Sequence, residues 1–426
     1  MFLQLFLYNI LFPIFFILYF PFYLKKQLKR GGIDSSFWER FGIFSASKRK
    51  KLTQLRAPVW IHAVSVGETV IALTFIEEWQ KLNPKINFVL STTTTTGQAI
   101  ARKKSNDSTT VIYMPFDFLL PLQNTFRLIK PSKLVIFEVE IWPNLLYLAK
   151  KNGVETSLVN GRMSDNSCKG FLKYAWFFKP VFQLFDKICV QTTEDARRFS
   201  AASGNKVTPL SCDTMKFDQA PKASGTLSRT FIESRLQPNT EIILIAASTH
   251  PGEEDLFLEV YKKLKSEHPG LSLILVPRHV ERTKEIEALI ESHNLSYSKL
   301  TDETKERKDL MLVNVTGELL SLINCSDIVF VGKSLKGNKG GHNIIEPAVF
   351  GKAILHGPDM QNFKVVSDIF QKENAALIVT EESLEDDLKL ILKDRQFRSD
   401  LGGNALSVVQ VHSGAVAKTI KKLSRD

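Results

Sequence analysis

The chain has 426 residues, of which 44% are hydrophobic and 24% charged, a composition that excludes a disordered or fibrous protein. Its length exceeds what one hydrophobic core usually holds, so we expect two domains. The formal net charge of +11 indicates an anionic partner: a phosphorylated ligand, a nucleic acid or an acidic membrane surface. The four cysteines form no C-x-x-C pair, which is typical of free thiols in a reducing cytoplasm and offers no zinc site.

The first 24 residues carry no charge and are rich in Phe, Leu, Ile and Tyr, whereas the stretch 25–30 is basic. We predict a membrane anchor at 1–24, because this run is long enough to span a bilayer with the basic stretch on the cytoplasmic side. A cleaved signal peptide is disfavoured, since no positive residue precedes the run and no small-residue cleavage site follows it. Pro13 and Pro21 complicate a straight helix, so an element lying in the membrane interface is the alternative.

From Ser36 onward the sequence alternates apolar strands with helical stretches, the pattern of a parallel sheet with helices on both faces. In the first half, the apolar spacing predicts a helix at Thr69–Leu82. His62 lies inside an apolar strand and is expected to be a satisfied core residue rather than a ligand. Strands are predicted at Val59–Val66, Phe88–Leu90, Leu134–Phe137, Ser157–Val159 and Ile188–Val190.

The stretch 218–228 contains Pro221, Gly225 and several small polar residues, which predicts a linker. We therefore expect an N-terminal domain at 25–217 and a C-terminal domain at 229–426, with a last helix able to pack back on the first domain. Ligands of such sheets bind beyond the carboxyl ends of the strands, so the expected fold is α/β, with two doubly wound domains facing a cleft. In the second domain, strands are predicted at Ile242–Ala247, Leu273–Val276, Leu310–Val313, Ile328–Val331, Ala353–Leu355 and Leu377–Val379.

Four side chains of the first domain are candidates for chemistry. Glu68 follows a strand in Val64-Ser-Val-Gly-Glu68, where a carboxylate can act as a general base; the competing interpretation is that it only favours the helix dipole. Glu138 and Glu140, two apart on an extended segment, point the same way and could divide acid and base roles or be a pair of surface charges. Lys216 lies at the hinge and could offset anionic charge, although a lone lysine usually faces solvent.

In the second domain, the stretch Lys339–Gly351 follows an apolar strand and leads into a helix, which is a phosphate-binding layout. Gly340 and Gly341 let the backbone approach a ligand closely, and the helix end favours an anion. Glu346, about one turn inside that helix, could accept hydrogen bonds from two sugar hydroxyls. A tight loop with a solvated glutamate is the alternative, but the clustering of these residues at a strand end favours a nucleotide carrying a sugar.

Other strand ends carry further candidates. Arg278, after Pro277, is a cation able to grip a phosphate, and Thr316-Gly-Glu318 opens a helix. The segment Ser248–Glu253 could hold an anion or simply be capped by its hydroxyls at 248 or 249. The sequence shows no Asp-x-Asp motif and no tight His, Cys or Glu cluster, so we expect neither a metal nor a cofactor. It also shows no aromatic-plus-basic RNA motif, so no nucleic acid is expected.

Taken together, these segments resemble the ordered signature of bacterial transferases of 3-deoxy-D-manno-octulosonic acid (Kdo). The similarity runs from about residue 37 to residue 363, and the combination of motifs is specific. The motifs that carry it are Val64–Glu68, Glu138–Asn144, Asn160–Ser164, Lys216–Asp218, Pro277–His279, Gly317–Glu318 and Gly340–Glu346.

The resemblance implies a GT-B architecture with an N-terminal membrane anchor helix, in which the first domain meets the acceptor and the second holds the donor nucleotide. It implies an inverting, metal-independent transfer of Kdo from CMP-Kdo to the lipid A precursor (lipid IVA) in lipopolysaccharide core biosynthesis. It also implies a place on the cytoplasmic face of the inner membrane, against an anionic membrane surface. The alternatives are another GT-B enzyme with a different activated sugar and a non-enzymatic membrane protein that binds nucleotide or RNA.

The family's functional residues carry over to matching positions of this sequence. Glu68 matches the general base, and Glu138 and Lys216 match residues that stabilise the transition state. The chain departs from the family pattern at Asp213, Gly161, Lys333 and Ile344, which places it on a divergent branch and leaves the acceptor and the number of sugars open. The segments that bind CMP match Pro277, Arg278, Thr316, Gly317, Glu318, Asn343, Ile344, Ile345 and Glu346.

Overall fold

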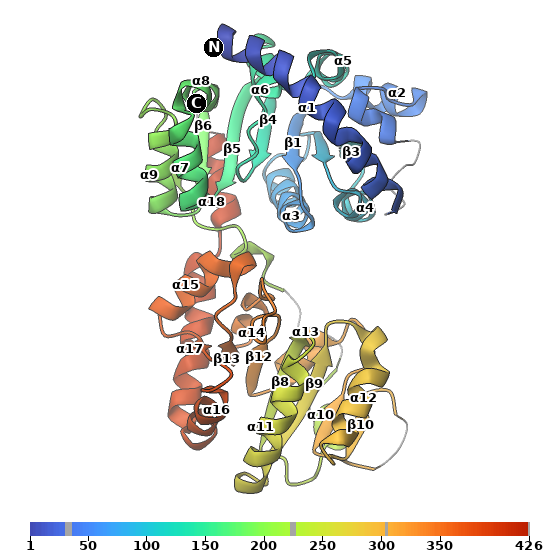
Figure 1. Ribbon diagram of the computed structural model, residues 1–426, viewed down its shortest axis with the longest axis vertical. Helices are drawn as coiled ribbons and strands as arrows, with labels where there is room; N and C mark the ends of the chain where they lie inside the picture. Colours follow the sequence, from blue (N-terminus) through green and yellow to red (C-terminus); the bar gives the residue numbers. More distant parts are fainter. Residues whose placement is uncertain (30–35, 222–226, 303–305, 425–426) are drawn as a thin grey trace. The chain divides into compact units, whose positions relative to one another are not determined.

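The computed structural model describes residues 1–29, 36–221, 227–302 and 306–424. The chain forms two compact units: unit 1 comprises Met1–Gln219 and Gly414–Asp426, and unit 2 comprises Ala220–Ser413 (Figure 1). Each unit contains a seven-stranded parallel sheet with flanking helices, which confirms the predicted α/β class. Residues 222–226 of the expected linker and Arg30 of the basic stretch lie outside the described residues.

The sheet of unit 1 has the strand order β3-β2-β1-β4-β5-β6-β7. The chain starts at the central strand β1, winds outward through β2 and β3, and then returns to β4 on the other side of β1. This reversal is the topological switch point of a doubly wound fold. The strands are β1 (Val59–Ala63), β2 (Phe88–Thr92), β3 (Thr109–Tyr113), β4 (Lys133–Phe137), β5 (Glu155–Gly161), β6 (Lys187–Val190) and β7 (Leu210–Ser211).

The helices of unit 1 bury both faces of this sheet. Along β1, Trp60 packs into the cluster on one face while Val59 and Ile61 pack into the cluster on the other. Because both faces are covered, the central strands are continuous apolar runs, which is why the sequence predicts them well. The helices are α2 (Ala46–Gln54), α3 (Val66–Leu82), α4 (Thr95–Lys104), α5 (Leu119–Ile129), α6 (Pro143–Lys151), α7 (Asp165–Lys173), α8 (Ala175–Phe182), α9 (Thr193–Ala202) and α18 (Ala415–Leu423), with the short 3-10 helices η1 (Phe37–Phe41) and η2 (Phe217–Gln219).

The last helix, α18, belongs to unit 1. Its apolar residues Ala415, Val416 and Ile420 join the same buried cluster as α3. Asp218 in η2 accepts hydrogen bonds from the backbone N–H groups of Gly414 (2.6 Å) and Val416 (2.8 Å), which fixes the start of α18. The chain therefore leaves unit 1 after Gln219 and re-enters it at Gly414.

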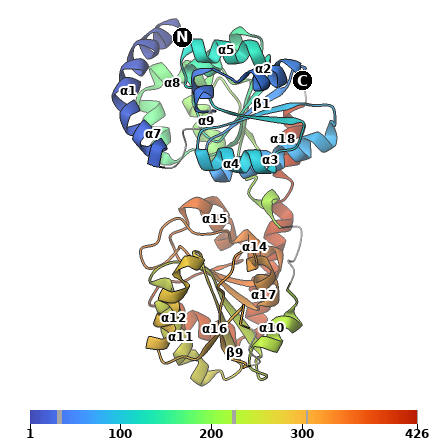
Figure 2. The same ribbon diagram turned by 90° about the vertical axis from the view of Figure 1, so that its right-hand side faces the viewer.

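The N-terminal helix, α1 (Phe2–Lys29), is continuous through both prolines. It is long and apolar enough to cross a membrane, with a mean hydropathy of 2.0 over an 18-residue window within Phe2–Lys25. The helix α1 nevertheless runs along the rest of unit 1 (Figures 1 and 2). On that side, the rings of Phe12 and Phe16 contact Phe118. The opposite side leaves large apolar side chains exposed, namely Phe2, Leu3, Phe6, Ile10, Leu11, Ile14, Phe15, Ile17, Leu18 and Phe22.

Unit 2 repeats this plan with the strand order β10-β11-β9-β8-β12-β13-β14, so its switch point lies between β8 and β12. Its strands are β8 (Ile242–Thr249), β9 (Leu271–Pro277), β10 (Tyr297–Lys299), β11 (Leu310–Leu312), β12 (Ile328–Val331), β13 (Ala353–His356) and β14 (Leu377–Ile378). Its helices are α10 (Arg229–Arg235), α11 (Glu253–Glu267), α12 (Thr283–Ser292), α13 (Leu319–Cys325), α14 (Ile345–Val349), α15 (Lys364–Lys372), α16 (Leu384–Lys393) and α17 (Arg395–His412), with the 3-10 helices η3 (Val280–Arg282) and η4 (Gln361–Phe363).

The structure corrects several predicted boundaries. β1 ends at Ala63 rather than Val66, because Ser65 caps a helix that starts three residues earlier than predicted. The edge strands β7 and β10 and the threonine-containing β3 were not predicted, since none of them is a long apolar run. His62 is buried as predicted, with Nδ1 3.1 Å from the Ser91 hydroxyl, but its buried Nε2 has no hydrogen-bond partner, so it is only partly satisfied. Burial lowers its pKa to about 4.

Candidate functional site

In both units the candidate residues gather at the carboxyl ends of the strands beside the switch point. In unit 1, Glu68 follows β1 and Glu138 follows the adjacent strand β4. In unit 2, His250 follows β8 and the loop that starts at Gly332 follows its neighbour β12. Loops diverge at this point of a doubly wound sheet, which leaves room for a ligand.

Glu68 is buried in the first turn of α3, where it forms a capping box with Ser65. The Ser65 hydroxyl accepts from the Glu68 N–H (3.2 Å), and the Glu68 carboxylate accepts from the N–H groups of Ser65 (3.3 Å) and Val64 (2.8 Å). The carboxylate is thus held rigidly at the strand end. Each of its oxygens has a second lone pair that these bonds leave available for a substrate hydroxyl.

Glu138 and Glu140 form a bend rather than the predicted extended segment. Glu138 has a left-handed backbone (φ 57°), so the alternation of an extended strand does not determine where the two side chains point. A tight bend places them instead: the Glu138 N–H donates to Val159 O (2.9 Å), and the Glu140 carboxylate accepts from the Trp142 indole N–H (3.1 Å). Both carboxyl groups are half-buried, so they are not a pair of surface charges.

The three carboxylates of this edge interact electrostatically. Burial, together with the negative charge of Glu68, raises the pKa of Glu138 to about 7 and that of Glu140 to about 7. Lys216 and Arg162 oppose the rise at Glu138, so both cations are close to it. Near neutral pH the site therefore holds carboxyl groups that can exchange a proton, which suits acid–base chemistry.

Lys216 is partly buried rather than solvent-facing. Burial is the main cause that lowers its pKa, while Glu138 acts in the opposite direction. Its loop is fixed by Asn160, whose side-chain oxygen accepts from the Met215 N–H (3.1 Å) and whose backbone is left-handed (φ 52°). The motif around Asn160 thus holds the lysine loop and also carries Arg162 into the carboxylate cluster.

In unit 2 the loop after β12 is organised by Glu253, the first residue of α11. This fully buried carboxylate accepts four backbone hydrogen bonds, from His250, Lys333, Ser334 and Leu335, at 2.9–3.0 Å. It connects the loops at the switch point. The hydroxyls at 248 and 249 do not cap α11, whose N-cap is Gly252.

Packing within the chain requires glycine at positions 340 and 341. Both have positive φ (120° and 65°), and a Cβ would lie 2.6 Å from Asn362 Nδ2 and 2.1 Å from Met360 Sδ, respectively. The close approach is thus to a turn of this chain. The following helix, α14, has only five residues, so its dipole gives less support for an anion than predicted.

Asn343 and Glu346 lie together at the start of α14. Asn343 Nδ2 donates to Glu346 Oε1 (3.2 Å), and Asn343 Oδ1 accepts from the Ile345 N–H (3.1 Å). Glu346 is the second residue of the helix rather than one turn inside it. The side chains of Ile344 and Ile345 are fully buried, so only their backbone could meet a ligand.

A basic cluster lies beside Glu346. Burial raises the pKa of Glu346, and Asn343 and Arg278 oppose that rise, which places Arg278 within electrostatic reach. Burial also lowers the pKa of His250 and His342 to about 4, helped by nearby cationic groups that include Arg278 and Lys333. The two imidazoles are 3.0 Å apart at Nε2, so one donates to the other. This cluster can receive an anion.

Two further donor-site candidates lie at neighbouring strand ends. Pro277 ends β9, and the following Arg278 N–H donates to Thr249 O (3.0 Å), which ties it to β8. Thr316 and Gly317 are exposed, and Gly317 has a left-handed backbone (φ 99°). Glu318 is the N-cap residue of α13, as the sequence predicts.

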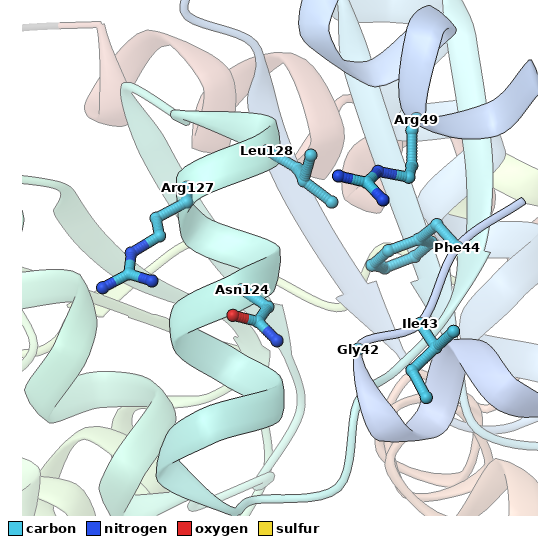
Figure 3. A pocket seen from close by; sticks show the side chains of 7 residues that line it. All are labelled: Gly42, Ile43, Phe44, Arg49, Asn124, Arg127 and Leu128. Atoms are coloured by element: carbon cyan, nitrogen blue, oxygen red, sulfur yellow. The ribbon is translucent and has the colours of Figure 1, made fainter. Parts of the chain in front are cut away.

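Two pockets of unit 1 have very different walls. One, of about 350 Å³, is lined by residues of α2, of α5 and of the segment before α2, and the guanidinium group of Arg49 lies beside the ring of Phe44, whereas the Arg127 side chain extends away on the other side of α5 (Figure 3). The other, of about 310 Å³, is mainly aromatic. It is lined by Phe12, Phe16, Tyr19, Tyr23, Arg40, Thr93, Met114, Pro115, Phe116, Asp117 and Trp142.

Residues 35–219 match the family model described as "3-Deoxy-D-manno-octulosonic-acid transferase (kdotransferase)". The 3-deoxy-D-manno-octulosonic acid transferase of Rickettsia felis is 32% identical over 340 residues, covering 79% of this chain and 72% of the relative. The chain belongs to the Kdo transferase family. The transferase of Haemophilus influenzae is 27% identical, with 86% of each chain covered. A glycosyltransferase of Rickettsia africae has the same fold, with a TM-score of 0.56 at 14% identity over 86% of this chain and 97% of its own.

Membership of the Kdo transferase family makes this chain a glycosyltransferase with GT-B architecture. The sequence indicates no role for Arg162 or Glu253, and the family resemblance gives none to Glu140. Arg162 directly follows β5, and this position at a strand end is the only local feature that points to a functional role. By its position, Glu253 can be read only as a glutamate that favours a helix dipole. The backbone N–H groups that it binds lie about 80 residues away, so the local sequence gives no sign of them.

Proposed function

We propose that this chain is an inverting, metal-independent enzyme that transfers Kdo from CMP-Kdo to the lipid A precursor (lipid IVA) in lipopolysaccharide core biosynthesis. The observation that carries the proposal is the group of three interacting carboxylates, Glu68, Glu138 and Glu140, at the switch point of unit 1. Inverting transfer needs one base for the acceptor hydroxyl and groups that stabilise charge on the departing phosphate.

In unit 1 we assign the base to Glu68. Its carboxylate would take the proton from an acceptor hydroxyl while that oxygen attacks the anomeric carbon, and the bond to CMP breaks with its electron pair going to the phosphate. Glu138, beside Lys216 and Arg162, would orient the acceptor and stabilise the transition state. The capping box supports this assignment, because it fixes the carboxylate before substrate arrives.

In unit 2 we assign the donor site to the basic cluster. Arg278 would bind the phosphate of CMP-Kdo, and Lys333 and the two histidines would contribute further donors. Glu346 would accept hydrogen bonds from sugar hydroxyls, held in position by Asn343. The turn Thr316–Glu318 and the backbone at Pro277 and Asn343–Ile345 would complete the nucleotide site.

The direct test is a transfer assay with the full-length protein. With CMP-Kdo and a tetraacylated bisphosphorylated glucosamine disaccharide, we expect a product heavier by one or more Kdo units in the mass spectrum. With UDP-activated sugars in place of CMP-Kdo we expect no product. Transfer from a UDP-sugar but not from CMP-Kdo would contradict the proposal and favour a different GT-B activity.

Arg278→Ala tests the donor site. Loss of a charge-assisted contact with phosphate of about 1.5–3 kcal/mol should weaken CMP-Kdo binding about tenfold to a hundredfold, as measured by calorimetric titration. Arg395→Ala is the matched control, because Arg395 is an exposed arginine at the start of α17 in the same unit. Equal affinities for the two variants would remove Arg278 from the site.

We also propose that unit 1 attaches to an anionic membrane surface on the cytoplasmic side. The exposed apolar side of α1 supports attachment to lipid, and the basic helix α2 and the pocket with Arg49 and Arg127 support anionic head groups (Figure 3).

Reversing a charge in this pocket tests the attachment to anionic lipid. Each charge near the surface contributes about 1 kcal/mol, and Arg127→Glu changes two charges, so it should weaken binding to anionic vesicles about thirtyfold in sedimentation. Binding to neutral vesicles should not change. Arg197→Glu, on the exposed side of α9, makes the same charge change and serves as the control. An equal loss in both variants would mean that net charge alone, rather than this pocket, sets the binding.

A further inference from the structure

The aromatic pocket of unit 1 has walls from two sources. Helix α1 provides four rings, Phe12, Phe16, Tyr19 and Tyr23. The segments that follow β2, β3 and β4 provide the other wall, which includes Thr93, Met114, Pro115, Phe116 and Trp142. The pocket therefore lies between the apolar N-terminal helix and the same sheet edge that carries the carboxylates.

Polar contacts hold α1 against unit 1. Asn9 and Asn144 exchange side-chain amide hydrogen bonds of 2.9 Å, and Tyr8 hydrogen bonds to the buried Asp117. Near the start of the helix, the Gln4 amide donates to Trp176 O (3.0 Å). In a helix surrounded only by lipid, these polar side chains would have no hydrogen-bond partners. Their partners on unit 1 therefore favour a helix that lies on the protein.

Ring contacts continue along the rest of the helix. Phe16 meets Phe116 at 4.7 Å between ring centres, and Phe20 meets Phe41 at 6.2 Å. The contacts thus extend from Gln4 to Phe20, about 24 Å of helix at about 1.5 Å per residue. The helix cannot cross a bilayer while it keeps them, because the folded unit would enter the hydrocarbon. On a membrane, a helix that keeps these contacts would lie along the surface, with its exposed apolar side in lipid.

The pocket reaches the candidate catalytic carboxylates through Trp142. This side chain lines the pocket, and its indole N–H donates to Glu140 (3.1 Å). The charged groups in the pocket wall are engaged with the protein: Arg40 lies over the Tyr113 ring (4.0 Å) and donates to Thr93 O (2.7 Å). Asp117 accepts from the first N–H groups of α6. The space that remains is bounded mainly by apolar surface.

We propose that this pocket holds one acyl chain of the glycolipid acceptor and thereby positions its sugar at the carboxylates; the proposal rests on the proposed function. A chain that leaves the lipid beside α1 would lie in the pocket against the contacting rings of Phe16 and Phe116 and remain in apolar surroundings. Burial of methylene groups makes this favourable. The head group of the same molecule would then lie on the side of Trp142, next to Glu140. The pocket would thus select acylated acceptors.

A photoactivatable acceptor tests the proposal. The full-length protein in vesicles is irradiated with an acceptor that carries a diazirine in one acyl chain, and adducts are mapped by mass spectrometry. We expect adducts on Phe16 and Met114–Phe116, which line the pocket. Adducts only on outward residues such as Leu11, Phe15 and Leu18 would overturn the proposal. So would equal labelling of the pocket by a diazirine phospholipid that excess acceptor fails to displace, because the occupant would then be a membrane lipid.

Two neighbouring phenylalanines of α1 provide a matched pair of variants. Phe16→Trp adds volume inside the pocket, whereas Phe15→Trp makes the same change on the exposed side. We expect Phe16→Trp to raise the KM for the acylated acceptor about tenfold and to leave the KM for CMP-Kdo unchanged. Phe15→Trp should change neither. Equal acceptor KM values for the two variants would sink the pocket proposal, whereas absence of any Kdo transfer by the wild-type protein would instead overturn the proposed function.

Discussion

Glu68→Gln is expected to lower Kdo transfer by about a thousandfold, within the range of about 10²–10⁴ that general-base catalysis contributes. The reason is chemical rather than structural. Glutamine keeps an oxygen that can accept one of the N–H groups of Val64 and Ser65, so the start of α3 stays capped. It cannot accept a proton from the acceptor hydroxyl.

The measurement separates catalysis from binding. Because Glu68 belongs to unit 1, titration of CMP into Glu68→Gln should give the wild-type affinity for unit 2. Glu77→Gln is the control, since Glu77 is exposed on the same helix and should keep full activity. Retained transfer in Glu68→Gln would reassign the base, and Glu138 or Glu140 would become the candidates because their pKa values lie near 7.

The variant Glu68→Ala helps to interpret a partial loss of Kdo transfer in Glu68→Gln. Alanine also removes the capping box, which typically stabilises a protein by about 1 kcal/mol. If Ala and Gln reduce turnover equally while only Ala lowers the thermal midpoint, the lost activity comes from the missing base. If only Ala reduces turnover, the role of Glu68 is structural, which is the competing interpretation of its place in the first turn.

The sequence predicted the architecture because buried parallel strands are continuous apolar runs. Runs such as Ile242–Ala247 and Ile328–Val331 have no other simple interpretation, and their alternation with helices indicates two doubly wound sheets. β3 was missed because it begins with two threonines, although both are buried beside β2. The family motifs identified the strand ends where chemistry is expected, since these ends are where the loops of such a fold diverge.

Loop geometry could not be predicted, because it depends on contacts between distant segments. The sequence around Glu138 looks extended, yet the backbone turns left-handed there and brings two carboxylates under the influence of Glu68. The pattern at 340 and 341 predicts a ligand loop, and it gives no sign that both glycines also fit against Met360 and Asn362, about 20 residues later. Local sequence patterns therefore predicted which segments carry the candidate site. The contacts of each side chain depend on tertiary packing, which these patterns do not determine.

Glu138→Gln is expected to abolish efficient transfer and, at the same time, to stabilise unit 1 at alkaline pH. Burial and the Glu68 charge raise the pKa of Glu138 from 4.5 to about 7. Between these two values the folded protein keeps a proton that the unfolded chain has lost, so stability falls as the pH rises through this window. Above pH 7 the folded protein bears the full penalty of an ionised, half-buried carboxylate.

The size of the effect follows from the pH interval. The interval from pH 5.5 to the pKa near 7 is about 1.5 pH units. At about 1.36 kcal/mol per unit, the wild-type protein loses about 2 kcal/mol of unfolding free energy over this interval. The gain from Glu138→Gln should therefore be about 2 kcal/mol larger at pH 8 than at pH 5.5. For a unit of this size, such a gain raises the thermal midpoint by about 5 °C.

Thermal unfolding of the wild-type protein, Glu138→Gln and the exposed control Glu77→Gln at both pH values checks this expectation. The control should show no pH-dependent gain. If Glu138→Gln raises the thermal midpoint equally at pH 5.5 and pH 8, then Glu138 has an ordinary pKa. The charge of Glu68 would then not act on it. If Glu138→Gln gains stability in a pH-dependent way and also loses transfer, then Glu138 serves catalysis and lowers the stability of the folded protein, as expected for an active site that trades stability for activity.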